Sequence, residues 1–450
     1  MKVLHVTHVH PERGSGGVEH YLRELFAEQP RHGVEPELLA GAHEIRERVT
    51  VEEGSFAGRR AAVLYRDEWF HHHHVKAWHP HAQAAFRAFL RRERPALLHV
   101  HQWLGLSQDL VQVATQEGVP AVVTLHDLYA SCPRVFRVRR DEQACFRPLS
   151  VESCLRCVPI LGHEPDAEVA EGIRLFQANA RAELSRARAV LAATDVTADL
   201  VAQALPFPRD RITVLPLGYA RRFGTAPPRP AALPGPGQPL RFGYWGNLTQ
   251  RKGAQVLVGA FRRLCAEGLP RPAELHLYGR IDTPLLEAEL RNAAAGLPVR
   301  FHGRYEYPQL AAAGLHVAIF PFLCFETFAF VLDEAFELRL PVVVTDLGAL
   351  SARSGGAAVR VPPRDEAALA SALRELLHDP ARLETLRAAI PPLAPTVQEH
   401  ARALAALYER AARSPAPEPL QHVEDTQRLA FLLLQRESAL RRLAPDGGPK

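Results

Sequence analysis

The sequence predicts an α/β protein with two doubly wound parallel sheets, one in each half of the chain. At 450 residues it is too long for one hydrophobic core and long enough for two domains of ordinary size. Short β-branched runs alternate with helical patterns in both halves. Between them, residues 224–239 (GTAPPRPAALPGPGQP) break the alternation with proline and glycine, which predicts a linker.

The first half predicts a domain over residues 1–223. An apolar strand at 3–9 leads through a glycine-rich loop into a helix at 18–27. A cysteine-rich insertion is expected at about 130–165. This alternation is typical of a parallel sheet with helices on its faces. Further strands are expected at 37–40, 97–100, 121–125, 190–193 and 212–215.

The second half predicts another sheet domain over 240–395. Helices are expected at 254–266 and 284–294, and strands at 240–245, 274–278, 299–302, 315–320 and 341–344. Residues 396–450 are expected to be helical, and the first helix should pack back on the N-terminal domain. Because open parallel sheets bind ligands beyond the carboxyl ends of their strands, we expect the site between the two domains.

Composition excludes several classes of protein. Apolar residues make up 47% and charged residues 23%, which argues against extensive disorder. The net charge of +4 is too small to indicate nucleic-acid binding by itself. The N-terminus lacks the apolar core of a signal peptide, so we expect a cytoplasmic protein. The basic stretch 86–94 (FRAFLRRER) is either a surface for anionic lipid at the inner face of the membrane or a solvated helix face.

The most informative spacing lies in residues 320–341 (FPFLCFETFAFVLDEAFELRLP). Glu326 and Glu334 follow an apolar strand with seven residues between them, and Thr327 is well placed to cap a helix. Eight helical steps would separate the glutamates by about 12 Å along the axis. A glycosidase pair needs about 5–9.5 Å. The spacing therefore favours two glutamates that bind different hydroxyl-bearing parts of one long ligand, with two solvated helix glutamates as the alternative.

Two strand-to-helix loops are candidates for phosphate binding. The first, 13–19 (RGSGGVE), places backbone N–H groups at a helix start, unless it is only a tight turn. It lacks the G-x-G-x-x-G order, which disfavours a nicotinamide or flavin enzyme. The second loop contains Asn247, Arg251 and Lys252. Its two cations could neutralise a leaving diphosphate or could be solvated surface residues.

Two further clusters could bind metal. The run 71–74 (HHHH), with His79 and His81, could bind metal, line an acceptor cleft or form a solvated loop. Four cysteines in the predicted insertion suit a tetrahedral structural zinc site, with free thiols, an iron–sulfur cluster or disulfides as alternatives. These are Cys132, Cys145, Cys154 and Cys157.

Four motifs in sequence order resemble a known family. They are GGVE at 16–19, TLHD at 124–127, G-N-x-x-x-R-K-G at 246–253, and E-x7-E from Glu326 to Glu334 followed by PVVVTD. Together they are similar to the motifs of the retaining, nucleotide-sugar-dependent glycosyltransferases of family 4, which have the GT-B fold. The resemblance covers about residues 1–412.

The resemblance implies a role for each matched residue. Gly16 and Gly17 would approach the donor phosphates, and His126 would contact the transferred sugar near its anomeric centre. Lys252 would stabilise the leaving diphosphate, and Glu326 would hold sugar hydroxyls. The remaining donor-binding positions are Asn247, Arg251, Thr327, Phe328 and Glu334, the last of which would bind the ribose.

Three departures from the family pattern keep alternatives open. Asn247 stands where arginine is frequent, and Ala329 and Arg339 stand where glycine is frequent. Arg251 could substitute for the missing arginine. The departures favour a catalytically silent scaffold as an alternative to a transferase. Within the same fold, a nucleotide-sugar epimerase or a sugar phosphorylase is the enzymatic alternative.

The resemblance also implies partners and cofactors. The donor would be a UDP or GDP sugar, and the acceptor a hydroxyl of a glycan or a lipid-linked molecule in polysaccharide biosynthesis. No D-x-D pair is present, which agrees with a family that generally needs no catalytic metal.

Overall fold

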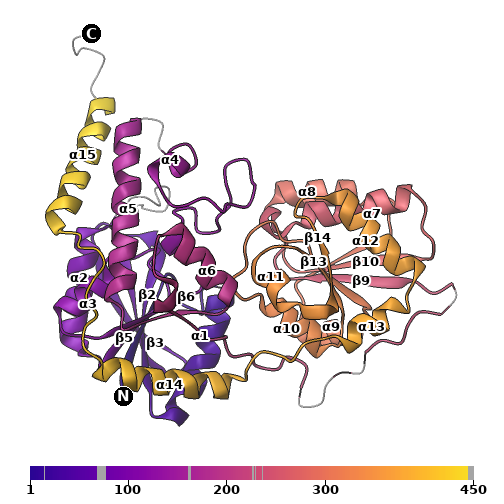
Figure 1. Cartoon of the computed structure of the whole chain (residues 1–450), viewed down its shortest axis with the longest axis horizontal. Helices are drawn as coiled ribbons and strands as arrows, with labels where there is room; N and C mark the ends of the chain where they lie inside the picture. Colours follow the sequence, from indigo (N-terminus) through magenta and orange to yellow (C-terminus); the bar gives the residue numbers. More distant parts are fainter. Residues whose placement is uncertain are drawn as a thin grey trace, which may run out of the picture. The chain divides into compact units, whose positions relative to one another are not determined.

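The computed structural model describes residues 1–14, 16–67, 78–160, 164–224, 228, 230–235 and 237–443. The chain forms two compact units, each with its own sheet (Figure 1). The histidine run 71–74 lies outside the described residues. Unit 1 comprises Met1–Arg140, Cys145–Gly218 and Pro395–Lys450, and unit 2 comprises Asp141–Ala144 and Tyr219–Ala394.

Unit 1 contains an eight-stranded sheet in the order β3-β4-β2-β1-β5-β6-β7-β8. All neighbouring strands are parallel except β3 and β4, which form an antiparallel hairpin. This hairpin was not predicted from the sequence, because β3 (TVEEGSF) is largely exposed and polar, as edge strands often are. The strands are β1 Lys2–Thr7, β2 Glu35–Ile45, β3 Thr50–Phe56, β4 Arg59–Arg66, β5 Leu97–Val100, β6 Ala121–Leu125, β7 Ala189–Ala192 and β8 Ile212–Val214.

The helices of unit 1 come from both ends of the chain (Figure 1). The 3-10 helices are η1 Gln29–His32, η2 Tyr129–Ser131 and η3 Arg209–Arg211. The α-helices are α1 Gly17–Glu28, α2 Pro80–Glu93, α3 Leu110–Gln116, α4 Val151–Cys154, α5 Asp166–Arg186, α6 Asp195–Ala204, α14 Val397–Arg413 and α15 Asp425–Leu443. Among the described helices, none has the length and apolarity needed to cross a bilayer.

Helix α14 belongs to unit 1 although it follows the whole of unit 2 in sequence. It begins with a capping box in which Thr396 and Glu399 satisfy each other's backbone N–H groups. Its His400 Nε2 lies 3.0 Å from the Tyr21 hydroxyl of α1. Gly218 contacts the start of the helix so closely that a Cβ there would lie 2.8 Å from the Cα of Val397.

Unit 2 contains a six-stranded, fully parallel sheet in the order β11-β10-β9-β12-β13-β14. Strand order reverses between β9 and β12, as in a doubly wound fold. The two parallel sheets confirm the predicted fold class. The strands are β9 Leu240–Trp245, β10 Ala273–Tyr278, β11 Val299–Gly303, β12 Val317–Phe320, β13 Val342–Thr345 and β14 Ala358–Val361.

Helices connect these strands and bury the sheet's apolar core. The 3-10 helices are η4 Gln250–Lys252 and η5 Gly355–Ala357. The α-helices are α7 Ala254–Ala266, α8 Pro284–Ala293, α9 Tyr307–Ala312, α10 Phe330–Glu337, α11 Gly348–Arg353, α12 Glu366–His378 and α13 Arg382–Ala388.

Helix α10 begins at Phe330, so the prediction that Thr327 caps it is wrong. Ala329 adopts a left-handed conformation with φ of 64°, and regular helical geometry starts only after it. Glu326 therefore lies in the loop after β12, whereas Glu334 lies on the helix. The helical separation of about 12 Å does not apply, because residues 327–329 between the two glutamates are not helical.

Candidate active site

The ends of β9 and β12 meet where the strand order of unit 2 reverses. Open α/β sheets bind ligands beyond the carboxyl ends of their strands at such a point. The loop after β9 carries Lys252, and the loop after β12 carries Glu326. Their side chains meet, with Lys252 Nζ 2.5 Å from Glu326 Oε1. The fold thus assembles an ion pair at the expected position for a ligand site.

Lys252 is held from several directions. Its backbone N–H donates to Thr249 Oγ1 at 3.1 Å, and its ammonium lies 4.1 Å from the ring centroid of Phe322. Gly253 follows with φ of 70°, and a Cβ there would lie 1.9 Å from the carbonyl oxygen of Pro321. Only glycine permits this approach. The side chains of Lys252 and Glu326 remain 30% and 22% exposed, so a ligand can reach both.

Glu334 has partners different from those of Glu326. Its Oε2 accepts a hydrogen bond from Trp245 Nε1 at 2.7 Å, and its Oε1 accepts one from the Tyr307 hydroxyl at 3.1 Å. Burial raises the pKa of Glu334 to about 7, although the Trp245 hydrogen bond acts in the opposite direction. The carboxyl group therefore changes charge near neutral pH.

The other donor-binding residues predicted on unit 2 lie in the same two loops, after β9 and after β12. The backbone carbonyl of Asn247 accepts from the Tyr244 hydroxyl at 2.9 Å. The carbonyl of Arg251 accepts from the Leu323 N–H at 2.8 Å, which ties the loop after β9 to the loop after β12. Thr327 lies in the second of these loops.

Phe328 is fixed by an arginine of α11. Arg353 Nη1 donates to the carbonyl of Phe328 at 2.7 Å, and its guanidinium stands 3.7 Å from the ring centroid. The same guanidinium binds both oxygens of the buried Asp333 on α10, at 2.9 and 3.0 Å. In addition, the backbone N–H of Ala349 donates to the carbonyl of Glu326 at 3.0 Å. These contacts hold the loop that carries Glu326.

On unit 1, the predicted residues follow the ends of β1 and β6. Gly16 caps α1 and Gly17 is its first residue. A Cβ at Gly16 would lie 2.6 Å from Glu19 Oε2, so a buried carboxylate sits beside the glycine loop. Its Oε1 is 3.5 Å from His8 Nε2. His126 follows β6 and is half-buried.

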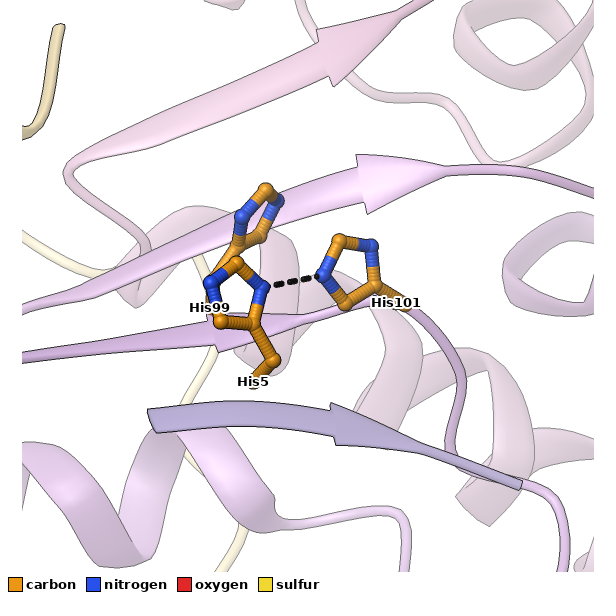
Figure 2. Close-up of side chains that lie close together, drawn as sticks. All are labelled: His5, His99 and His101. Atoms are coloured by element: carbon orange, nitrogen blue, oxygen red, sulfur yellow. Dashed lines mark hydrogen bonds between the residues drawn. The ribbon is translucent and has the colours of Figure 1, made fainter. Parts of the chain in front are cut away.

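His126 contacts a group of histidines that was not predicted from the sequence. Figure 2 shows His5, His99 and His101 of this group. His126 Nε2 is 2.9 Å from His101 Nδ1, and His101 Nε2 is 2.9 Å from His5 Nδ1. His5 on β1 pairs in register with His99 on β5. The H-V-H pattern at 99–101 was the available signal, since alternate residues of a strand face the same side.

His99 completes this group of buried imidazoles. Its Nδ1 lies 2.6 Å from the Tyr408 hydroxyl of α14, and its Nε2 lies 2.7 Å from Thr124 Oγ1. Burial lowers the pKa of His5 and of His126 to about 3, and it lowers the pKa values of His99 and His101 well below the ordinary value. The group is therefore neutral at physiological pH.

The four cysteines of the predicted metal site are all free thiols and half-buried. Among the described residues, no three of their sulfurs lie within 4.8 Å of one another. Burial raises the pKa of Cys132 to about 11, and the nearby Cys154 and Cys145 raise it further. Arg137 anchors the loop by donating to the Cys145 carbonyl at 2.9 Å. Zinc binding remains a prediction, which metal analysis can decide.

The basic stretch 86–94 lies mostly on α2, where its arginines form ion pairs within unit 1. Arg87 Nη1 lies 2.7 Å from Glu117 Oε1, and Arg91 Nε lies 2.7 Å from Glu117 Oε2. Phe86 and Phe89 of the same stretch are buried in the unit.

Comparison with known families decides the identity of the chain. The family described as "Glycosyltransferase Family 4" matches residues 15–221, and the family described as "Glycosyl transferases group 1" matches residues 239–379. The chain belongs to the family 4 glycosyltransferases. This glycosyltransferase is thus a retaining enzyme with the GT-B fold, which transfers sugar from a nucleotide sugar, as the motif resemblance implied. No curated protein sequence matches it significantly.

Solved structures share the fold of this glycosyltransferase at low sequence identity. Sucrose-phosphate synthase from Thermosynechococcus elongatus is 18% identical with a TM-score of 0.59, covering 98% of this chain and 100% of its own. Anabaena HepE in complex with UDP and glucose is 14% identical with a TM-score of 0.56, and the coverage is again 98% and 100%. The UDP-forming α,α-trehalose-phosphate synthase from Burkholderia xenovorans, solved with glucose-6-phosphate, is 13% identical with a TM-score of 0.60, covering 92% and 100%.

Proposed function

We propose that this glycosyltransferase moves a hexose from a UDP sugar to a hydroxyl group of a glycan or lipid-linked acceptor in polysaccharide biosynthesis. The observation that carries the proposal is the ion pair between Lys252 and Glu326 where the strand order of unit 2 reverses. A cation and a carboxylate placed side by side suit a ligand that presents phosphate oxygens next to sugar hydroxyls.

In this proposal the donor's diphosphate competes with Glu326 for the ammonium group of Lys252. A diphosphate carries more negative charge than one carboxylate, so Lys252 moves its main interaction to the leaving group. Glu326 is then able to accept hydrogen bonds from the hydroxyls of the transferred sugar. The departing phosphate accepts the proton of the incoming hydroxyl on the same face of the sugar, which keeps the configuration of the anomeric carbon.

Glu334 is proposed to bind the ribose of the nucleotide. Trp245 and Tyr307 each donate to one of its oxygens, and each carboxylate oxygen has a second lone pair for a ribose hydroxyl. The structures of HepE with UDP, and the UDP-forming trehalose-phosphate synthase, support uracil as the base.

A donor screen tests the proposal. The enzyme is incubated with UDP and GDP sugars, and the released nucleoside diphosphate is measured with and without glycan acceptors. We expect turnover with a UDP sugar and a fall of about 10²–10³-fold in kcat for Lys252→Met, the usual effect of removing one electrostatic stabiliser of the transition state.

Lys2→Met provides a matched control in unit 1. Lys2 also pairs with carboxylates, at 3.0 Å from Glu37 and 3.3 Å from Glu93, and its side chain is 27% exposed. This variant should keep full turnover. Unchanged kcat in folded Lys252→Met would contradict the role proposed for that lysine, and release of GDP alone would contradict the proposed base.

A further inference from the structure

The buried carboxylate of Glu337 binds the entry segment, residues 219–223, which begin the main part of unit 2. Glu337 is the last residue of α10 and is only 2% exposed. Its Oε2 accepts from the Tyr219 hydroxyl at 2.7 Å and from the Arg222 N–H at 2.9 Å, and its Oε1 accepts from the Phe223 N–H at 3.2 Å. Arg222 and Phe223 belong to no helix or strand, so this side chain supplies the acceptors for their backbone N–H groups.

The entry segment in turn packs against Tyr307. The Phe223 ring meets the Tyr307 ring edge to face with the centroids 5.7 Å apart, and the Arg222 guanidinium lies 5.5 Å from the centroid of Tyr307. The Tyr307 hydroxyl donates to Glu334 Oε1 at 3.1 Å. A continuous set of contacts therefore leads from Glu337, through the entry segment and Tyr307, to Glu334.

We propose that Glu337 is a positioning residue of the donor site, which holds Arg222 and Phe223 against Tyr307 and thereby fixes the Tyr307 hydroxyl on Glu334. The arrangement of these side chains is a property of unit 2 without ligand. Its consequence for nucleotide binding rests on the proposed function.

A carboxylate satisfies all three donors of the entry segment, whereas an amide cannot. The Tyr219 hydroxyl can turn and accept, but a backbone N–H can only donate. Glutamine has one acceptor oxygen and one donating NH2 group. In Glu337→Gln the N–H of either Arg222 or Phe223 therefore faces another donor. Moving the entry segment away from α10 relieves this conflict, because water can then satisfy the N–H.

The charge of Glu334 reports whether Tyr307 and Arg222 stay in place. Burial is the largest influence on Glu334 and raises its pKa to about 7. Arg222 and Tyr307 both lower this pKa, by charge attraction and by hydrogen bonding. The groups that interact with the carboxyl group are Trp245 of β9, Tyr219 and Arg222 of the entry segment, Tyr305 and Tyr307 at the start of α9, and Asp333 of α10.

The two ways in which Glu337→Gln can act on Glu334 have opposite signs. Removing the negative charge of Glu337 would by itself make Glu334 easier to ionise and lower its pKa. Releasing Tyr307 and Arg222 would weaken two interactions with the ionised form and raise the pKa. A rise therefore identifies the positioning role.

Nitrogen NMR of tryptophan-labelled enzyme measures this effect without ligand. The indole N–H of Trp245 responds to the charge of Glu334, because the two groups share a hydrogen bond of 2.7 Å. Its signal is identified by its loss in Trp245→Phe, and its titration should disappear in Glu334→Gln. The midpoint should lie near pH 7 in the wild type. In Glu337→Gln it should rise to about pH 8.

Glu183→Gln is the matched control in unit 1. Glu183 is 1% exposed and also accepts three hydrogen bonds, from Trp103 Nε1 at 2.9 Å and from the N–H groups of Val111 at 2.8 Å and Gln112 at 2.9 Å. Its loss should leave the Trp245 midpoint unchanged. An equal rise in this control would overturn the proposal. So would an unchanged or lowered midpoint in folded Glu337→Gln, or a Trp245 signal that does not titrate in the wild type.

Glu337→Asp decides if Glu337→Gln does not fold. It keeps the charge and both acceptor oxygens but withdraws the carboxylate by one methylene group, so its hold on the entry segment weakens. The midpoint should again rise, and an unchanged midpoint would contradict the proposal. If neither variant folds, Phe223→Leu decides in the same way, because it breaks the next contact without altering α10.

UDP binding tests the consequence for the donor. In Glu337→Gln the Kd for UDP and the KM for the donor should rise about tenfold at pH 7, the effect of one lost hydrogen bond. The kcat at saturating donor should stay within about twofold, since the ribose is bound equally in the ground state and the transition state. A fall in kcat with an unchanged Kd would contradict the positioning role.

Failure of the proposed function has a different signature. An unchanged Kd for UDP together with a raised Trp245 midpoint would show that Glu334 does not bind the ribose. Absence of UDP binding to the wild type would refute the proposed function as well. Both outcomes leave intact the ligand-free titration, which by itself decides whether Glu337 positions Tyr307 on Glu334.

Discussion

The indole N–H of Trp245 donates a hydrogen bond of 2.7 Å to the buried carboxyl group of Glu334. Trp245 is the last residue of β9, and Glu334 lies on α10. The hydrogen bond therefore joins a strand of the unit 2 sheet to a helix of the same unit. The two donors to Glu334, Trp245 and Tyr307, are neutral. Burial therefore outweighs them and raises the pKa of Glu334 to about 7.

The raised pKa of Glu334 predicts pH-dependent nucleotide binding. A ribose hydroxyl donates best to the charged carboxylate, and the charged fraction grows as pH rises through about 7. UDP affinity should therefore increase from pH 6 to pH 8 more in the wild type than in Glu334→Gln. UDP affinity is measured by calorimetry for both proteins at each pH. The ionisation of UDP affects both affinities equally, so it does not change their ratio. A ratio of the two affinities that does not change with pH would exclude Glu334 as the ribose ligand.

The two positions where the family frequently has glycine predict stabilising substitutions. Ala329 has φ of 64° and Arg339 has φ of 59°, a region that costs a residue with a Cβ about 1 kcal/mol or more. Ala329→Gly and Arg339→Gly should each raise the free energy of unfolding of unit 2 by about 0.5–1 kcal/mol.

Hydrogen exchange of unit 2 peptides measures this effect separately from unit 1. Ala288→Gly is the control, because Ala288 is exposed within α8 and its replacement should destabilise unit 2 by about 1 kcal/mol. Destabilisation by the substitutions at Ala329 and Arg339 would show that the left-handed conformations do not exist in solution.

The buried imidazoles predict that unit 1 loses stability in mild acid. The pKa values of His5, His101, His126 and His400 are lowered by burial in the fold, so below about pH 6.5 the unfolded chain binds more protons than the folded one. Above that pH these histidines do not lower the free energy of unfolding of unit 1. Below it, each such histidine lowers this free energy by about 1.4 kcal/mol per pH unit.

Urea unfolding of unit 1 between pH 7.5 and pH 5.5 measures the slope. The slope of the free energy of unfolding against pH counts the protons that are taken up on unfolding. His5→Gln should lower this number by close to one, whereas His378→Gln, at an exposed position of unit 2, should not change it. A stability of unit 1 that does not vary over this range would contradict the burial of these rings.

The cysteine-rich loop predicts one zinc ion per chain. Tetrahedral zinc needs about 2.3 Å to each sulfur, so the four thiols would have to move closer together than the structure places them. Elemental analysis of enzyme purified without chelator should find zinc in the wild type and in Cys265→Ser. The double variant Cys154→Ser with Cys157→Ser should lose it. Zinc-free wild type with reactive thiols would show that the cysteines are free.

The sequence predicted the sheets well because a buried parallel strand is a short apolar run that can be recognised locally. It failed for β3, whose exposed face carries charged residues, and for the start of α10, because Ala329 is not a residue expected in a left-handed conformation. The pairing of His5 with His99 depends on which strands become neighbours. No local pattern contains that information, although the spacing of His99 and His101 shows that they share a face.

The position of α14 has a consequence for how the enzyme can be dissected. The side chains of Tyr408 and His400, which contact His99 and Tyr21, reach unit 1 only after the chain has completed unit 2. A fragment that stops at Gly218 would expose an unpaired imidazole and phenol where α14 should lie. The N-terminal half therefore does not form a complete unit by itself. During synthesis, the core of unit 1 is complete only after the ribosome has made α14.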